Sequence, residues 1–341
     1  MLETIWFVLW GVLWAVYFME QRIDLGVGTL APFIANNDTD KRLVYNSMGP
    51  FWDGNEVWLI TAGGVTFAAF PTTYAVMFSA LYTPLLLLLF ALILRAVALE
   101  FRSKETAEGW RKFWDVCHFI GSFVPALLLG VAFANIFQGI PIDGDGIFHG
   151  NLLTLLNFYG LLGGVLFVLL FVVHGALWLA AKTEAPLSSK AANAAASIWL
   201  AELVVAVIFL VATWFFTGLY NNYLSYPVLW LIPLITVAAL LAIRVFIAKE
   251  AWWKAWFASS LTIVGATLFG VTGLYPNLFP SSLNPAYSLT VFNSASSPYT
   301  LKIMLGVALT FVPIVIVYQT WSYFLFKDKV TTEDLASDEA Y

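Results

Sequence analysis

The stretch TLLNFYGLLGGVLFVLLFVVHGALWLAA, residues 154–181, contains no Asp, Glu, Lys or Arg. A helix needs about 20 apolar residues to cross a hydrocarbon core of about 30 Å, and it satisfies its backbone hydrogen bonds internally. This stretch is therefore predicted to be a membrane-spanning helix. The whole chain is similar in character, being 61% hydrophobic and 11% charged, whereas soluble domains carry about 25% charged residues.

Working outward, similar apolar runs predict an all-α, polytopic integral membrane protein with about nine transmembrane helices. The expected helices lie near residues 5–33, 50–70, 73–100, 114–137, 154–181, 194–217, 227–246, 254–275 and 300–326. The N-terminal run follows Glu3 and lacks the basic start of a secretory signal, so it is predicted to stay as the first helix.

A weak internal repeat indicates how these helices are grouped. Arg95 is followed by WRKFW at 110–114, and Arg244 is followed by WKAW at 253–256, each leading into an apolar helix. Duplication would give two four-helix units and one extra helix. The predicted divisions are 1–137 and 138–275 for the units, 276–326 for an outer loop and the ninth helix, and 327–341 for a cytoplasmic acidic tail.

The distribution of Lys and Arg predicts the orientation, because loops rich in these residues stay in the cytoplasm. Apart from Lys302, the residues in loops all fall on one side of the predicted membrane: Lys41, Arg42, Arg102, Lys104, Arg111, Lys112, Lys182, Lys190, Lys249, Lys254, Lys327 and Lys329. The N-terminus is therefore expected outside and the C-terminus in the cytoplasm, which requires an odd number of helices. Nothing in the composition indicates nucleic-acid binding.

Five ionisable residues inside predicted helices are the candidate functional groups: Glu20, Asp24, Asp53, Glu56 and Arg95. Such groups are costly in hydrocarbon unless they are paired or hydrated. At a rise of 1.5 Å per residue, Asp24, Asp53, Glu56 and Arg95 lie within roughly 15 Å of the cytoplasmic ends of their helices. The sequence therefore predicts charge at one level of the membrane.

Helical spacing places Glu20, Asp24 and Gly28 on one face of the first helix and turns Arg22 away. If the charged residues cluster, the acids outnumber Arg22 and Arg95. Partly buried carboxylates linked by water exchange protons readily, so a proton path is one hypothesis.

Structural alternatives stay open for several of these residues. Asp53 and Glu56 have the spacing of a helix capping box, and Arg95 could extend to the membrane interface. His118 and His174 are potential haem ligands, although packing within the helix bundle is favoured.

Asp115, Glu202 and Cys117 have no specific predicted role. Asp115 and Glu202 could be further water-accessible acids. The lone Cys117 can form neither an internal disulfide nor a metal site made of cysteines.

The sequence GPFWDGNEVWL at 49–59 is too elaborate for a generic membrane helix and resembles subunit II of cytochrome bd-type quinol oxidases. The resemblance continues, in order, through DLGVG at 24–28, NDT at 37–39, ITAGG at 60–64, FRSK at 101–104, GSFVPALLLGVAF at 121–133 and PSSLNP at 280–285. One departure is Gln21-Arg22-Ile23, where the family usually has Asp-Gly-Phe before DLGVG.

The resemblance implies a complex in the bacterial cytoplasmic membrane that oxidises quinol, reduces dioxygen to water and generates a proton gradient. Its b-type and d-type haems would be held by subunit I, and this chain would be the haem-free partner that binds no metal. A small single-helix subunit and a structural quinone or lipid are compatible with the family. Asp53 and Asp24 match acids of its cytoplasmic proton route.

Two rival functions remain at the level of sequence. Intramembrane acids and a repeat also suit a proton-coupled secondary transporter, although the repeats look parallel and paired Gly/Pro breaks are missing from the helices. Alternatively, the chain is a purely structural subunit whose acids only cap helices and orient the chain.

Overall fold

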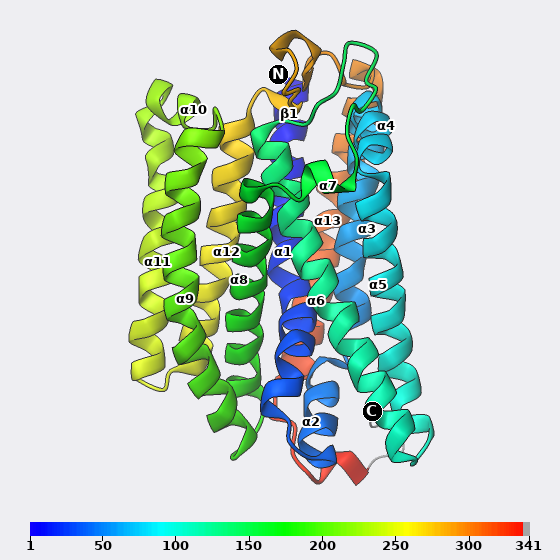
Figure 1. Ribbon diagram of the computed structural model, residues 1–341, viewed down its shortest axis with the longest axis vertical. Coiled ribbons are helices and arrows are strands. Elements are labelled where there is room, and N and C mark those ends of the chain that lie inside the picture. Colours follow the sequence, from blue (N-terminus) through cyan, green and yellow to red (C-terminus); the bar gives the residue numbers. More distant parts are fainter. Residues whose placement is uncertain (337–341) are drawn as a thin grey trace.

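The computed structural model describes residues 1–336 of the chain, and it consists of long helices packed side by side (Figure 1). Within these residues, eight helices are long and apolar enough to cross a membrane. They are α1 (Leu2–Ile34), α5 (Tyr82–Phe101), α6 (Glu108–Gln138), α8 (Phe158–Lys182), α9 (Leu187–Phe216), α11 (Leu231–Ala248), α12 (Trp252–Leu274) and α13 (Pro298–Leu325). The chain is thus an all-α, multi-pass membrane protein. The expected tail of 327–341 is described only as far as residue 336.

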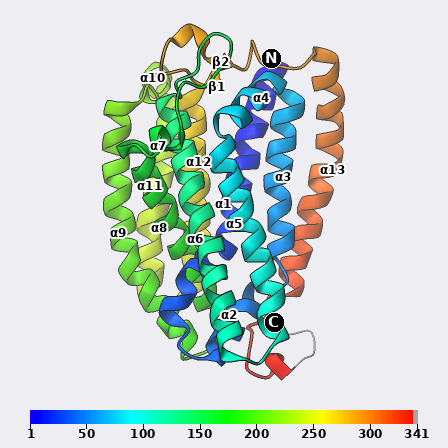
Figure 2. The same cartoon turned by 45° about the vertical axis from the view of Figure 1, so that its right-hand side comes forward.

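Helix α3 (Trp52–Ala69) overlaps the helix expected at 50–70 but is not among these eight. It has 18 residues and runs alongside the other long helices (Figure 2). Its first turns carry Asp53, Asn55 and Glu56, and glycines follow at 63 and 64, so it is less apolar than its neighbours.

Two local features between α1 and α6 differ from the sequence prediction. Residues expected as a loop form α2 (Asp38–Met48), whose N-cap Asn37 accepts a 2.7 Å hydrogen bond from the backbone N–H of Asp40. The helix predicted over 73–100 is divided at Leu81 into α4 (Pro71–Ala80) and α5. Proline is favoured in the first helical turn, and Pro71 begins α4 there.

Short elements complete the two ends of the bundle. They are α7 (Leu152–Leu155), α10 (Tyr220–Ser225) and the 3₁₀ turns η1 (Arg102–Lys104), η2 (Pro227–Trp230), η3 (Pro285–Tyr287) and η4 (Asp334–Ala336). Strands β1 (Asn277–Phe279) and β2 (Leu289–Thr290) pair antiparallel within the segment 276–299, which was predicted as a loop. Ile140 joins this segment through a 2.9 Å bond from its N–H to the Pro280 carbonyl.

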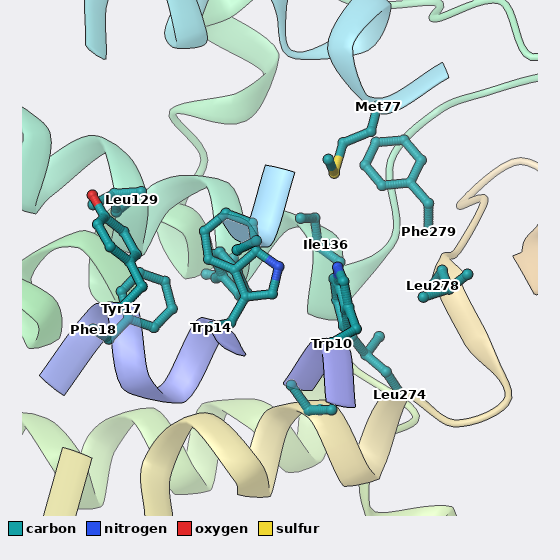
Figure 3. Packing of buried hydrophobic residues seen from close by; sticks show 14 of the residues in the cluster. Trp10, Trp14, Tyr17, Phe18, Met77, Leu129, Ile136, Leu274, Leu278 and Phe279 are labelled. Atoms are coloured by element: carbon teal, nitrogen blue, oxygen red, sulfur yellow. The ribbon is translucent and has the colours of Figure 1, made fainter. Parts of the chain in front are cut away.

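Helix α1 lies in the centre and packs against α3, α6, α8 and α12. Its contact with α8 is between backbones, because a Cβ on Gly26 would lie 1.9 Å from the Phe171 carbonyl oxygen. Small residues at such crossings are typical of membrane helices. Nearer the N-terminal end, Trp10, Trp14 and Phe18 fill the space around α1 with aromatic rings (Figure 3).

Candidate functional site

An acid cluster forms where α1, α3 and α5 meet. Arg95 on α5 is fully buried and pairs with Glu56 on α3. Gln21 on α1 donates a 2.9 Å hydrogen bond from Nε2 to the same Glu56 Oε1. The Arg95 guanidinium also lies over the Trp52 ring, 5.8 Å from its centre. Charge-assisted hydrogen bonds of this kind are the strong ones, so Glu56 is firmly held.

A second set of hydrogen bonds links the two acids of α1 through α3 and α13. The Tyr323 hydroxyl donates to Glu20 Oε2 at 2.5 Å and lies 3.2 Å from Asn55 Oδ1. Asn55 Nδ2 then donates to Asp24 Oδ2 at 2.9 Å. The hydroxyl can donate and accept a proton, whereas the Asn55 amide serves to orient the acids.

The predicted residues Glu20, Asp24, Glu56 and Arg95 are therefore brought together, but Asp53 is not. Asp53 is exposed on α3, roughly 200° around the helix from the buried Asn55 at 100° per residue. The face it occupies is the outer face of the bundle.

The structure excludes the capping box and the interfacial position of Arg95, whereas Asp53 does lie in the first turn of α3, where an acid is favoured by the helix dipole. The N-cap residue of α3 is Phe51, which has no capping side-chain bond, so Asp53 and Glu56 do not form a capping box. Arg95 does not extend to an interface, since its side chain is 0% exposed and is paired with Glu56.

Charge is unbalanced in this cluster. Among the side chains that the structure describes, Glu20, Asp24 and Glu56 stand against the single guanidinium of Arg95. The side chain of Arg22, which the sequence analysis turned away from this face, lies outside the described part of the chain. An excess of carboxyl groups over bases is what a relay of exchangeable protons requires.

A second ionic network, missed at the level of sequence, lies at the α2 end of the bundle. Asp115 accepts from Lys41 Nζ at 2.7 Å and from Arg102 Nε at 2.6 Å, and the Tyr45 hydroxyl donates to it at 3.2 Å. Burial, followed by the charge of Asp115, raises the pKa of Tyr45. Asp38 bonds Arg102 at 2.9 Å. Asp115 thus fastens α2 to α6 and to the turn after α5.

Glu202 and the two histidines lie apart from the acid cluster. Glu202 on α9 is buried beside a small apolar cavity of about 90 Å³. His174 on α8 lies 3.1 Å from Ser259 Oγ and against the Trp256 ring. His118 on α6 packs edge-to-face against Tyr45, with ring centres 4.8 Å apart.

Comparison with known proteins now decides the family. Residues 2–326 match the family described as cytochrome bd terminal oxidase subunit II. The chain belongs to this family. It is 36% identical over 335 residues to cytochrome bd ubiquinol oxidase subunit 2 of Bacillus subtilis (strain 168), covering 98% of both chains.

A second relative agrees with this subunit II assignment, and a solved structure is similar in fold. The chain is 37% identical over 370 residues to cytochrome bd-I ubiquinol oxidase subunit 2 of Escherichia coli (strain K12), covering 98% of this chain and 97% of the relative. Its fold is similar to a chain in the structure of bd oxidase from Geobacillus thermodenitrificans, with a TM-score of 0.74, 18% identity and coverage of 95% and 99%. As a subunit II, the chain is part of a terminal quinol oxidase complex and is a multi-pass protein of the bacterial cytoplasmic membrane.

Proposed function

We propose that this chain supports a haem-bearing subunit I in a heterodimeric core and contributes a proton path from the cytoplasm. The complex oxidises quinol, reduces dioxygen to water and generates a proton gradient. Its b-type and d-type haems are held by subunit I, and this chain binds no haem or metal. The match to the terminal-oxidase family supports this assignment over a secondary transporter.

The observation that carries the proton path is the connection of Glu20 to Asp24 through Tyr323 and Asn55. Three helices contribute to it, and its polar atoms lie among otherwise apolar side chains. A carboxyl group passes a proton to a hydroxyl or to a water molecule over a single hydrogen bond. Water beside the Asn55 amide completes the transfer, because the amide nitrogen does not release a proton.

The orientation follows from the basic residues. Lys41, Arg42, Arg102, Arg111 and Lys112 gather at the α2 end, and loops rich in Lys and Arg remain in the cytoplasm. The N-terminus then lies outside and α3 is a ninth crossing. In this orientation the acid cluster is nearer the cytoplasm, which is the source of the protons used to make water.

Asp53 supplies the argument for where subunit I binds. An ionised carboxylate facing lipid is costly, and Asp53 is exposed on the outer face of α3. Helix α13 beside it is also largely exposed, with Leu301 as its one buried residue. A partner that covers both would shield Asp53 and place this acid at the junction of the two subunits, on the route toward the oxygen-reducing haem.

The first experiment isolates the tagged complex in mild detergent and records its reduced-minus-oxidised visible spectrum and the masses of the co-purifying chains. Haem bands together with a larger membrane subunit are expected. A chain that is isolated intact, free of haem and alone would overturn the proposal.

The Asp53→Asn variant then separates proton conduction from a scaffold role. Slower oxygen uptake in a complex with a normal haem spectrum is expected. Unchanged turnover would remove Asp53 from the path, and loss of assembly with normal turnover per haem would favour a purely structural subunit.

A further inference from the structure

A cavity of about 530 Å³ lies at the α2 end, between α1, α2 and α6, and the proton path described above does not use it. Its mouth is marked by Lys112, whose side chain is 69% exposed, and its inner wall by His118, which is 2% exposed. Lys41, Tyr45 and Asp115 line it between these two. It thus leads from a charged surface to a buried imidazole.

His118 is unusual because neither ring nitrogen has a hydrogen-bond partner within the described residues. Buried polar atoms are nearly always bonded to protein or to ordered water. The cavity is large enough for several water molecules, which need only about 30 Å³ each. Water in the cavity would satisfy the ring nitrogen that faces it.

His118 Nε2 faces α1 at Gly28, which lines the same cavity and lies one turn of the helix from Asp24. A Cβ on Gly28 would lie 2.6 Å from His118 Nε2, so the glycine leaves the space that the ring occupies. Gly28 and Asp24 are one turn apart on the same face of α1, a rise of about 6 Å. Asp24 Oδ1 is likewise buried and without a partner among the described residues.

Helix α5 adds a third group at this junction. Gly121 lies one turn beyond His118 on α6, and a Cβ there would be 2.8 Å from the Cβ of Arg95. Arg95 Nε and Nη1 are also buried and lack partners in the part of the chain described. Unsatisfied donors and acceptors from α1, α5 and α6 therefore gather between the cavity and the acid cluster.

We propose that this cavity is a water-filled uptake route for protons and that His118 relays them from it to Asp24. The inference rests on the proposed proton path and gives that path a starting point inside this subunit. In each passage one ring nitrogen accepts a proton from cavity water and the other ring nitrogen releases its proton to water bound at Asp24 Oδ1. The imidazole is positively charged only in transit, and a half-turn of the ring then brings the newly protonated nitrogen to the Asp24 side and the free nitrogen to the cavity.

The charges that face the imidazole suit a transient cation. Asp115 on α6 favours it, whereas Arg95 and Arg102 on the α5 side and Lys41 on α2 oppose it. Asp115 is largely neutralised by Lys41 and Arg102. The protonated ring is therefore not stabilised enough to become a trap.

Two variants test the route in the purified complex, with oxygen uptake measured under excess quinol. His118→Gln keeps the volume and hydrogen bonding but cannot carry a proton, and Ala31→Phe fills the cavity from its α1 wall. The first variant removes the group that accepts and releases the proton and the second excludes the water that supplies it, so turnover should fall roughly a hundredfold, the lower end for loss of an acid–base group, while the haem spectrum is unchanged. His174→Gln is the matched control and should keep normal turnover, because His174 does not line this cavity.

Chemical rescue separates a relay from a packing role. In His118→Gly, added imidazole can reach the vacated space through the cavity and should restore turnover, whereas it should not restore Ala31→Phe. Normal turnover in both His118→Gln and Ala31→Phe would overturn the route, and so would slow turnover in His118→Gly without rescue. If either variant does not assemble, the other decides. Slow turnover in Asp24→Asn alongside normal turnover in the His118 variants would leave the proposed function standing without this route.

Discussion

The hairpins α5–α6 and α11–α12 correspond in sequence, yet their arginines are in opposite environments. Arg95 is fully buried and paired with Glu56, whereas Arg244 near the end of α11 is exposed. A buried cation requires a partner, but an exposed one needs only water. Only the first hairpin adjoins acids from α1 and α3. The comparison teaches that similar sequence around two arginines does not give them the same environment, since only Arg95 is buried and paired with an acid among the described residues.

The largest effect is expected from the arginines themselves. Replacing Arg95 with Met leaves Glu56 without its cation, and breaking a buried pair costs about 3–5 kcal/mol. The midpoint of thermal inactivation of the complex, compared at one scan rate, should fall by roughly 5–10 °C. Arg244→Met is the control and should cost less than about 0.5 kcal/mol. Equal losses in both variants would remove the distinction between the hairpins.

The next effect concerns two buried acids, Asp24 on α1 and Glu202 on α9. Asp24→Asn removes a proton acceptor from the cluster, and oxygen uptake should fall roughly a hundredfold, the lower end for loss of an acid–base group. Glu202→Gln makes the same change at the buried acid of α9 and should leave turnover unchanged. If Glu202→Gln were as slow as Asp24→Asn, Glu202 on α9 would also belong to a proton path.

A smaller effect is expected from α13, which contacts Glu20 through the Tyr323 hydroxyl. Tyr323→Phe removes the hydroxyl that bonds Glu20, and a hydrogen bond of about 1 kcal/mol corresponds to roughly fivefold slower turnover. Tyr318→Phe on the same helix is a suitable control, since Tyr318 is 65% exposed. A normal rate in Tyr323→Phe would show that Glu20 exchanges protons without α13.

The smallest effect is expected in the segment between α6 and α8, which contains Asp143 and His149. Asp143 accepts hydrogen bonds from the His149 ring and from the Ile147 N–H. These two bonds, the first most strongly, lower its pKa. His149→Ala should raise that pKa, which carboxyl carbon chemical shifts can follow. The pKa of Asp143 is lower in the folded protein than in the unfolded chain, so the ionised carboxylate stabilises the fold at pH values above the unfolded pKa. This stabilisation is lost as the pH falls through the folded pKa. Because Asp143 and His149 are on the surface, no change in assembly at neutral pH is expected.

Apolar periodicity predicted the long helices because each must match the membrane thickness, and the crossings at α1 and α8 were found within a few residues. It missed α2 because a helix held by the Asn37 cap and by ion pairs to Asp38 and Asp40 has no apolar run. It also joined α4 to α5, since nothing in the apolar pattern marks Leu81 as a break.

The candidate site was predicted in part. The spacing of Glu20 and Asp24 placed them on one face, and Arg95, a candidate from its depth in the membrane, is paired with Glu56. Asn55, Gln21 and Tyr323 were missed because neutral polar residues give no charge signal and Tyr323 is far along the chain. A signal existed for Asn55, which lies within GPFWDGNEVWL. Asp53 lies on the outer face of α3, away from the other acids, so its expected clustering with them was wrong within this chain. Its role in a proton path stays a prediction.

Helix α13 has one further consequence, which concerns synthesis. It is the last of the described membrane helices to leave the ribosome, and it is attached by scattered bonds such as Trp58 Nε1 to Gln319 Oε1 at 2.8 Å. During translation the carboxyl groups of α1 therefore enter the bilayer before the Tyr323 hydroxyl exists. The link between Glu20 and Asn55 closes only when the final helix is inserted. Chains released early by the ribosome thus lack this connection.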